Sequence, residues 1–150
     1  MDISLNDIKA LREETGVAIN KCKKALEEAQ GDMEKAREIL SASSAKAAAK
    51  KADRELNAGV IQAYVHPNHT MGVLLHLACE TDFVAKNEDF IALANDIAMH
   101  IAAMMPETKE ELLEQAFVKN PETIIAKLIE EATLKIGERI EVSAFTRYSI

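Results

Sequence analysis

Residues 59–79 read GVIQAYVHPNHTMGVLLHLAC, and the fold class is built outward from them. Two runs rich in β-branched and aliphatic residues, 59–66 and 71–79, lie on either side of Pro-Asn-His-Thr at 67–70. Apolar runs of this length, separated by a few residues that include proline and asparagine, are typical of a β-hairpin. The stretch therefore predicts two antiparallel strands joined by a short turn.

The chain after this hairpin predicts helices and one more strand. Residues 80–90 form a strand-to-helix loop, and 87–104 begin with an asparagine N-cap and continue with apolar residues at helical spacing. Residues 108–116 form at most a short helix. Asn-Pro-Glu at 120–122 predicts the start of a last helix, which Gly137 ends.

The final residues, RIEVSAFTRYSI at 139–150, predict a third strand. The order strand, strand, helix, helix, strand indicates an α+β fold, with a three-stranded antiparallel sheet packed with helices.

Residues 1–42 predict a bundle of three short helices. Ser4 and Asp32 are candidate N-caps, and Gly16 and Gly31 follow the first two helices, where a left-handed conformation commonly ends a helix.

A change of composition divides the chain into three parts. Residues 43–58 are rich in alanine and lysine with almost no large apolar groups, so they predict a connector, part helix and part flexible arm. We therefore expect a bundle at 1–42, the connector at 43–58 and an α+β core or dimerisation domain at 59–150.

Composition and charge exclude several classes of protein. The net charge of −7 arises wholly in residues 56–150, which carry 7 basic and 14 acidic groups. Such a chain is a poor candidate for non-specific nucleic-acid binding, which depends on neutralising phosphates. No apolar stretch approaches the roughly 18 residues of a membrane helix, and MDISLNDIK at the start is unlike a signal peptide. We expect a bacterial cytoplasmic protein without direct nucleic-acid or membrane contact.

Known catalytic motifs are absent from the sequence: there is no GxGxxG, GxxxxGK[ST], CxxC, HExxH or GxSxG. His66 and His69 have no evident third ligand, so two histidines in a surface turn are the simpler interpretation. Cys22 and Cys79 are expected to be free thiols, and Cys79 has no identifiable basic partner. The sequence predicts neither an enzyme nor a bound metal or cofactor.

The loop at Thr81-Asp82-Phe83-Val84 has two interpretations from the residues alone. In the first, Asp82 caps a turn and Phe83 is tucked into the core. In the second, Phe83 is an exposed wedge for protein recognition, flanked by an acid.

Two longer motifs add a resemblance. LREETG at 11–16, continuing through CKKAL at 22–26, resembles the first signature of the elongation factor Ts family of bacteria and organelles. ETDFVAKN at 80–87 is similar to the second signature of that family. The resemblance extends over nearly the whole chain, through KAAAKKAD at 46–53, AMHIAA at 98–103, LLEQAFVK at 112–119 and KIGE at 135–138.

This resemblance implies a guanine nucleotide exchange factor for the GTPase elongation factor Tu, in its GDP-bound and nucleotide-free forms. It implies a ubiquitin-associated-like fold for the bundle. It also implies that Thr81, Asp82, Phe83 and Val84 form a wedge that enters the GTPase near its magnesium ion and releases GDP.

The resemblance implies further contacts with the partner. Arg12 and Ile19 match positions that touch the GTPase domain, and Asn20 stands where the family commonly has methionine. His100 matches a histidine that faces another domain of the partner; from the residues alone, a packed or rim histidine is the alternative.

The chain resembles the short members of the family, which have one core and pair as homodimers. It also lacks the helical hairpin that the family carries between positions matching Met104 and Leu112. In the sheet, we expect Met71, Val73, Leu75, Leu77 and Cys79 on one face, and Leu74, His76 and Ala78, joined by Phe145, on a second face that a dimer would cover.

A second hypothesis is a protein-binding module without exchange activity, in which the bundle recognises a partner and the core only dimerises. Exposure of Asp82 and Phe83 favours exchange, whereas a packed Phe83 leaves only the module.

Overall fold

The computed structural model describes residues 3–150 and contains the predicted hairpin, β1 (Ala58–Val65) and β2 (Met71–Cys79). The last strand, β5 (Glu141–Ser149), pairs antiparallel with β2, so the sheet has the order β1-β2-β5. The α+β prediction and all three strands are confirmed.

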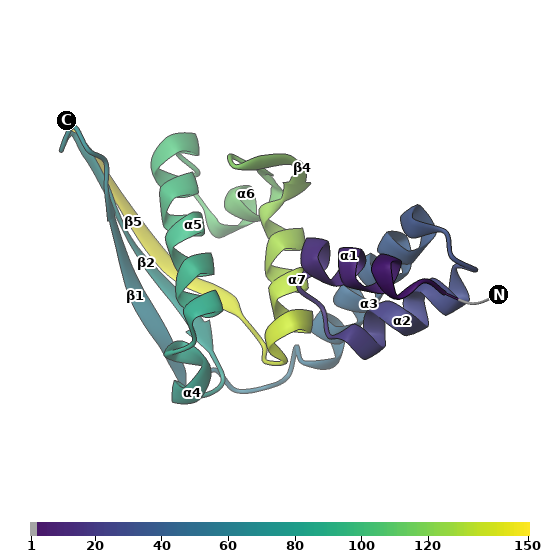
Figure 1. Cartoon of the computed structure of the whole chain (residues 1–150). Helices are drawn as coiled ribbons and strands as arrows, with labels where there is room; N and C mark the ends of the chain where they lie inside the picture. The colour runs from purple at the N-terminus through teal and green to yellow at the C-terminus, as the bar shows by residue number, and fades with distance from the viewer. Residues whose placement is uncertain (1–2) are drawn as a thin grey trace.

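Helices cover one face of this sheet. Figure 1 shows α5 (Glu88–Met104) against the sheet, α7 (Ile125–Ile136) beyond it and the N-terminal helices beyond α7. The inward residues of β2 are Val73, Leu75, Leu77 and Cys79, all buried as predicted, and they pack in one core with Phe90, Ile97 and Ile101 of α5. The predicted cap is present, because the Asn87 side chain accepts hydrogen bonds from the amides of Asp89 and Phe90.

Among residues 3–150, no helix covers the second face of the sheet in Figure 1, and the make-up of this face differs from the prediction in one residue. Phe145 pairs with Leu75 and packs on the core side, because strand register places paired residues on the same face. Ala78 alternates with the inward Leu77 and so lies on the second face as predicted, although it is buried. Leu74 and His76 are exposed on the outer face as expected.

The predicted helix start at Asn120-Pro121-Glu122 is wrong. Residues Asn120–Ile124 form strand β4, which pairs with β3 (Ala116–Phe117), and the helix starts only at Ile125. The buried Phe117 ring and a hydrogen bond from the Val118 amide to His100 hold this small hairpin against α5. Pairing between strands and packing therefore override the local capping signal.

Two short helices complete the core. The expected short helix is α6 (Lys109–Glu114). The strand-to-helix loop at 80–90 contains one unexpected turn of helix, α4 (Asp82–Ala85).

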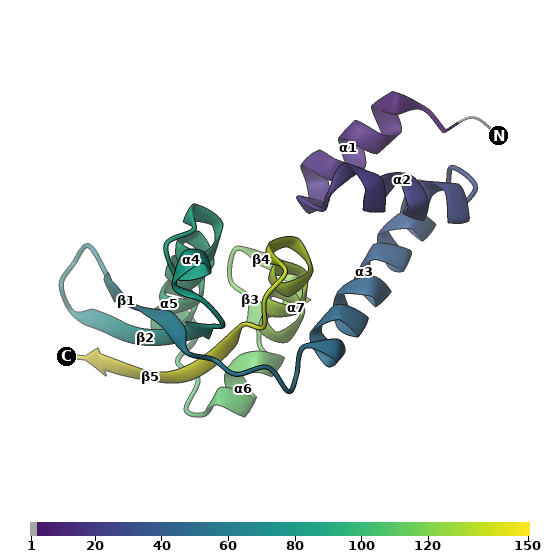
Figure 2. The same cartoon turned by 90° about the horizontal axis from the view of Figure 1, so that it is seen from below.

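The N-terminal bundle consists of α1 (Leu5–Thr15), α2 (Ile19–Glu28) and α3 (Met33–Lys50). Ser4 and Asp32 cap α1 and α3, and Gly16 ends α1 with φ +68°, as predicted. Figure 2 shows α3 running from the bundle towards the sheet domain. This one helix crosses position 42 and so belongs to both the predicted bundle and the predicted connector. The division into 1–42, 43–58 and 59–150 stays a prediction, as does the ubiquitin-associated-like fold.

The bundle is attached to the rest of the chain through α7. Leu134 of α7 belongs to the bundle's apolar core, and the Lys127 ammonium donates a hydrogen bond of 2.7 Å to the carbonyl of Ser41. Within residues 3–150, no helix has both the length and the apolar character needed to cross a membrane.

Candidate functional site

The most exposed large apolar side chain near the end of β2 is Phe83, on the one-turn helix α4. Its side chain is 90% exposed, whereas Val84 packs on the main core and Ala85 is buried. The interpretation that tucks Phe83 into the core is therefore wrong. Figure 1 shows α4 at the end of the sheet away from the C-terminus. The exposed ring is carried by a turn whose next two residues are anchored in the core.

The turn is built by its first residue. Thr81 is extended (φ −127°, ψ 153°), and its hydroxyl oxygen accepts a hydrogen bond of 3.4 Å from the Val84 amide, as an N-cap does. Asp82 follows in the first turn and is exposed. In the part of the chain that the structure describes, no ion pair or hydrogen bond engages the Asp82 carboxylate. The turn thus presents one carboxylate and one aromatic ring together.

A carboxylate from the end of α7 holds the start of this turn. One Glu138 oxygen accepts hydrogen bonds from the backbone amides of Glu80 (3.1 Å) and Thr81 (3.0 Å). The other accepts one from the Thr81 hydroxyl at 2.7 Å. Gly137, with φ +89°, ends α7 and turns the chain so that Glu138 follows directly.

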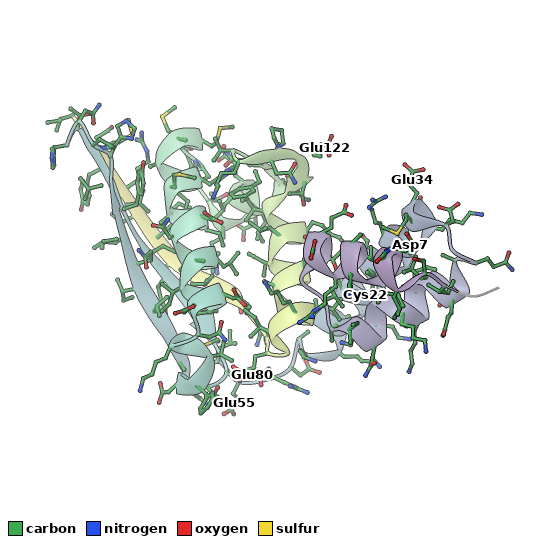
Figure 3. All side chains as sticks on the ribbon, in the orientation of Figure 1. Asp7, Cys22, Glu34, Glu55, Glu80 and Glu122 are labelled. Carbon is green, nitrogen blue, oxygen red and sulfur yellow. The ribbon has the colours of Figure 1, made fainter. Side chains whose placement is uncertain are left out.

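A second carboxylate ties the same region to two arginines. Glu80 accepts a 2.8 Å hydrogen bond from the Arg139 amide and lies 3.4 Å from the Arg54 guanidinium. Arg139 in turn donates to the Arg54 carbonyl and to Glu141, both at 2.7 Å. Figure 3 shows Glu80 at the α4 end of the molecule, near the segment that carries Glu55.

Sequence reasoning missed Glu80, Glu138 and Arg139 as residues that shape the loop. The signals were that Glu80 opens the second family signature and that 135–138 resembles family sequence, but nothing in the sequence connects Glu138 to Thr81, which is 57 positions away.

Cys79 lies beside the turn as a buried, protonated thiol. Burial raises its pKa, and the nearby Glu138 carboxylate raises it further. Its thiol donates a hydrogen bond of 3.3 Å to the Thr81 carbonyl. These features are those of a structural cysteine and not of a nucleophile, whose pKa is lowered.

His100 is fully buried in α5. Its Nδ1 accepts a hydrogen bond of 3.1 Å from the Val118 amide, and Nε2 lies 2.9 Å from the Gln115 amide oxygen. An accepting Nδ1 assigns the proton to Nε2, and burial lowers the pKa of the ring. The structure thus shows the packed histidine that was one of the alternatives from the sequence. A contact between His100 and a partner stays a prediction.

The other predicted contacts lie in the bundle. Arg12 is exposed in the last turn of α1, and Ile19 (44% exposed) and Asn20 open α2 on the other side of the Gly16 turn. Figures 1 and 2 show α7 between these helices and α4. The structure therefore places the predicted partner contacts of the bundle and the predicted wedge at 81–84 on two separate surfaces.

Metal ligands do not cluster in the described chain. Within residues 3–150, no three histidine, cysteine or acidic side chains lie close enough to hold an ion. His66 instead has its Nδ1 3.2 Å from the Tyr64 hydroxyl.

Comparison with known sequences identifies the family. The family model described as Elongation factor TS matches residues 4–111 and 80–150, which together span nearly the whole chain. The chain belongs to the elongation factor Ts family. Among its relatives, elongation factor Ts of Fervidobacterium nodosum is 42% identical, over 100% of this chain and 99% of that protein. Those of Thermotoga maritima and Desulforamulus reducens are 41% and 40% identical, over 100% and 99% of this chain and 97% and 89% of theirs.

Elongation factor Ts relatives are longer than this chain. The alignment with the Fervidobacterium protein spans 195 positions against 150 residues here, which leaves at least 45 positions without a counterpart. In this structure α5 ends at Met104 and α6 begins at Lys109, so four residues connect them and the helical hairpin expected from the family is absent there. Membership makes the chain an elongation factor of translation.

Proposed function

We propose that this chain is a guanine nucleotide exchange factor for elongation factor Tu, in which Thr81, Asp82, Phe83 and Val84 form the wedge that releases GDP. The observation that carries the proposal is the 90% exposure of Phe83 on a turn whose next two residues are anchored in the core. A large apolar ring held in water by an ordered turn is suited to burial against a partner.

The mechanism needs no covalent step, so the chain acts on its partner without being an enzyme in the strict sense. The chain binds nucleotide-free elongation factor Tu more tightly than the GDP-bound form. By thermodynamic reciprocity, GDP then binds less tightly to the complex. Phe83 enters near the magnesium site, and the Asp82 carboxylate beside it weakens the hold of that ion on the phosphates. Arg12, Ile19 and Asn20 bind the GTPase domain separately, in the bacterial cytoplasm where elongation occurs.

Affinity for the two states of the partner tests this function. Isothermal titration of the chain into nucleotide-free and GDP-saturated elongation factor Tu should give a lower Kd for the nucleotide-free form. Equal affinities would contradict exchange and favour the module without exchange activity.

We also propose that two chains pair through the outer face of the sheet. The exposed residues on this face are Ile61, Ala63, Val65, Leu74, His76, Ala144, Thr146 and Tyr148. None of them is an acid, lysine or arginine, and Ile61 and Leu74 are 66% and 54% exposed. Such a face commonly packs against another sheet, and a twofold pair of copies supplies one.

A further inference from the structure

The hydrogen bonds of Glu138 connect the wedge to α7, and α7 also carries the bundle. Leu134, four residues before Glu138, packs in the bundle's apolar core. Within residues 3–150, the Glu138 side chain receives three hydrogen bonds, all from Glu80 and Thr81 at the start of the wedge turn. The two surfaces that are proposed to touch elongation factor Tu are therefore attached to one helix.

We propose that Glu138 is a positioning residue for exchange: it fixes the wedge relative to the bundle, so that binding through the bundle drives Phe83 into the partner. This inference rests on the proposed function. Holding a reacting or inserting group in place in advance removes the cost of ordering it at the moment of binding. Here the group held is Thr81, the N-cap of α4, and Glu138, which holds it, directly follows the glycine that ends α7, the helix on which the bundle is packed.

The hydrogen bonds from Glu80 and Thr81 to Glu138 act as a tether: they hold the turn in place and contribute little to global stability. The three bonds are charge-assisted, which makes them stronger than bonds between neutral groups. Thr81 is exposed and Glu80 and Glu138 are only half-buried, so water can replace the lost partner when the carboxylate is removed. Loss of Glu138 should therefore loosen the turn while the cores of the sheet domain and the bundle remain packed.

Docking through the bundle comes first and insertion of Phe83 second, and this order predicts how Glu138→Ala changes the kinetics of GDP release. Docking through Arg12, Ile19 and Asn20 does not involve Glu138, so the concentration of GDP-bound elongation factor Tu that half-saturates exchange should change less than about threefold in Glu138→Ala. The maximal exchange rate should fall about 10- to 30-fold, because the wedge is no longer held in place.

Two variants separate positioning from structure. Glu138→Gln keeps one acceptor oxygen for the two amides and should recover most of the maximal rate. Glu114→Ala is the matched control, since it removes an exposed carboxylate at the end of α6, outside the turn and outside the contact between α7 and the bundle. This control should keep the wild-type rate.

Hydrogen exchange of the free chain tests the tether without any partner. Amide protection at Glu80 and Thr81 should drop in Glu138→Ala and stay unchanged in Glu114→Ala, with protection in α5 preserved. If amide protection at Thr81 is lost but the maximal rate of GDP release is unchanged, the positioning role alone is overturned. A wild-type chain that does not accelerate GDP release would instead overturn the proposed function, and unchanged protection at Thr81 would overturn the tether itself.

Discussion

Replacing Phe83 with alanine separates a residue that acts in binding from one that acts in folding. The side chain is 90% exposed, so its truncation removes little buried apolar area. The free energy of unfolding should therefore change by no more than about 0.5 kcal/mol, as for other surface substitutions. Phe90, whose side chain is fully buried in α5, offers the same substitution in the opposite environment. Its replacement should cost about 3–5 kcal/mol.

Binding should show the reverse of this contrast. Burying a phenylalanine ring from water is worth about 1.5–3 kcal/mol, and aromatic residues central to interfaces commonly cost about 2–4 kcal/mol when truncated. Phe83→Ala should therefore weaken binding to nucleotide-free elongation factor Tu by about 30- to 1000-fold. Affinity for the GDP-bound form should fall less, because the wedge is not inserted there.

Urea unfolding and isothermal titration of the variant measure the two quantities. Met105, which is exposed at the end of α5 and away from the wedge, supplies a control truncation to alanine that should leave both unchanged. A Phe83→Ala chain destabilised by more than 2 kcal/mol would mean that the ring is part of the folded core. Wild-type affinity for the nucleotide-free partner would mean that the ring is not a wedge.

Three further predictions concern the fold and the dimer. Burial lowers the pKa of His100 below its ordinary value of 6.5, so the unfolded chain takes up a proton at this site before the folded chain does. The free energy of unfolding should fall as the pH drops below about 6.5, by up to about 1.4 kcal/mol per pH unit from this group. Urea unfolding between about pH 7.5 and 5 should show a smaller fall in His100→Gln than in the wild type. Parallel plots of stability against pH for the two chains would refute this. A Cβ at Gly59 would press on the backbone carbonyl of Leu77, so Gly59→Ala should lower the free energy of unfolding by about 1–3 kcal/mol, and a neutral effect would mean that the strands separate freely there. Leu74→Glu should shift the sedimentation of the chain from dimer to monomer, whereas Met105→Glu, off the sheet face, should not; a wild-type chain that is monomeric at every concentration would contradict the dimer.

The sheet could be predicted from sequence because its pattern is strongly local. Alternating burial along Val73, Leu75 and Leu77 has the period of a strand, and the turn at 67–70 carries its own breaker residues. The prediction of a helix start at Asn120-Pro121-Glu122 is wrong because those residues favour a helix start locally, while pairing with β3 and the buried Phe117 decide the structure.

The site was predictable in its motif and not in its geometry. Thr81 to Val84 stand out in sequence, but periodicity cannot show whether Phe83 points in or out, since a single helical turn has no repeat. The support from Glu138 was invisible because the two segments meet only after α7 has packed beside the sheet. Exposure and long-range hydrogen bonds are thus the features that needed a structure.

Release of a fluorescent GDP analogue from elongation factor Tu tests the central claim most directly. We predict that substoichiometric amounts of this chain accelerate release, that each molecule acts repeatedly, and that Phe83→Ala removes most of the effect. No acceleration, with the partner shown to be active, would contradict the exchange function and leave a binding module that has the family's sequence without its activity.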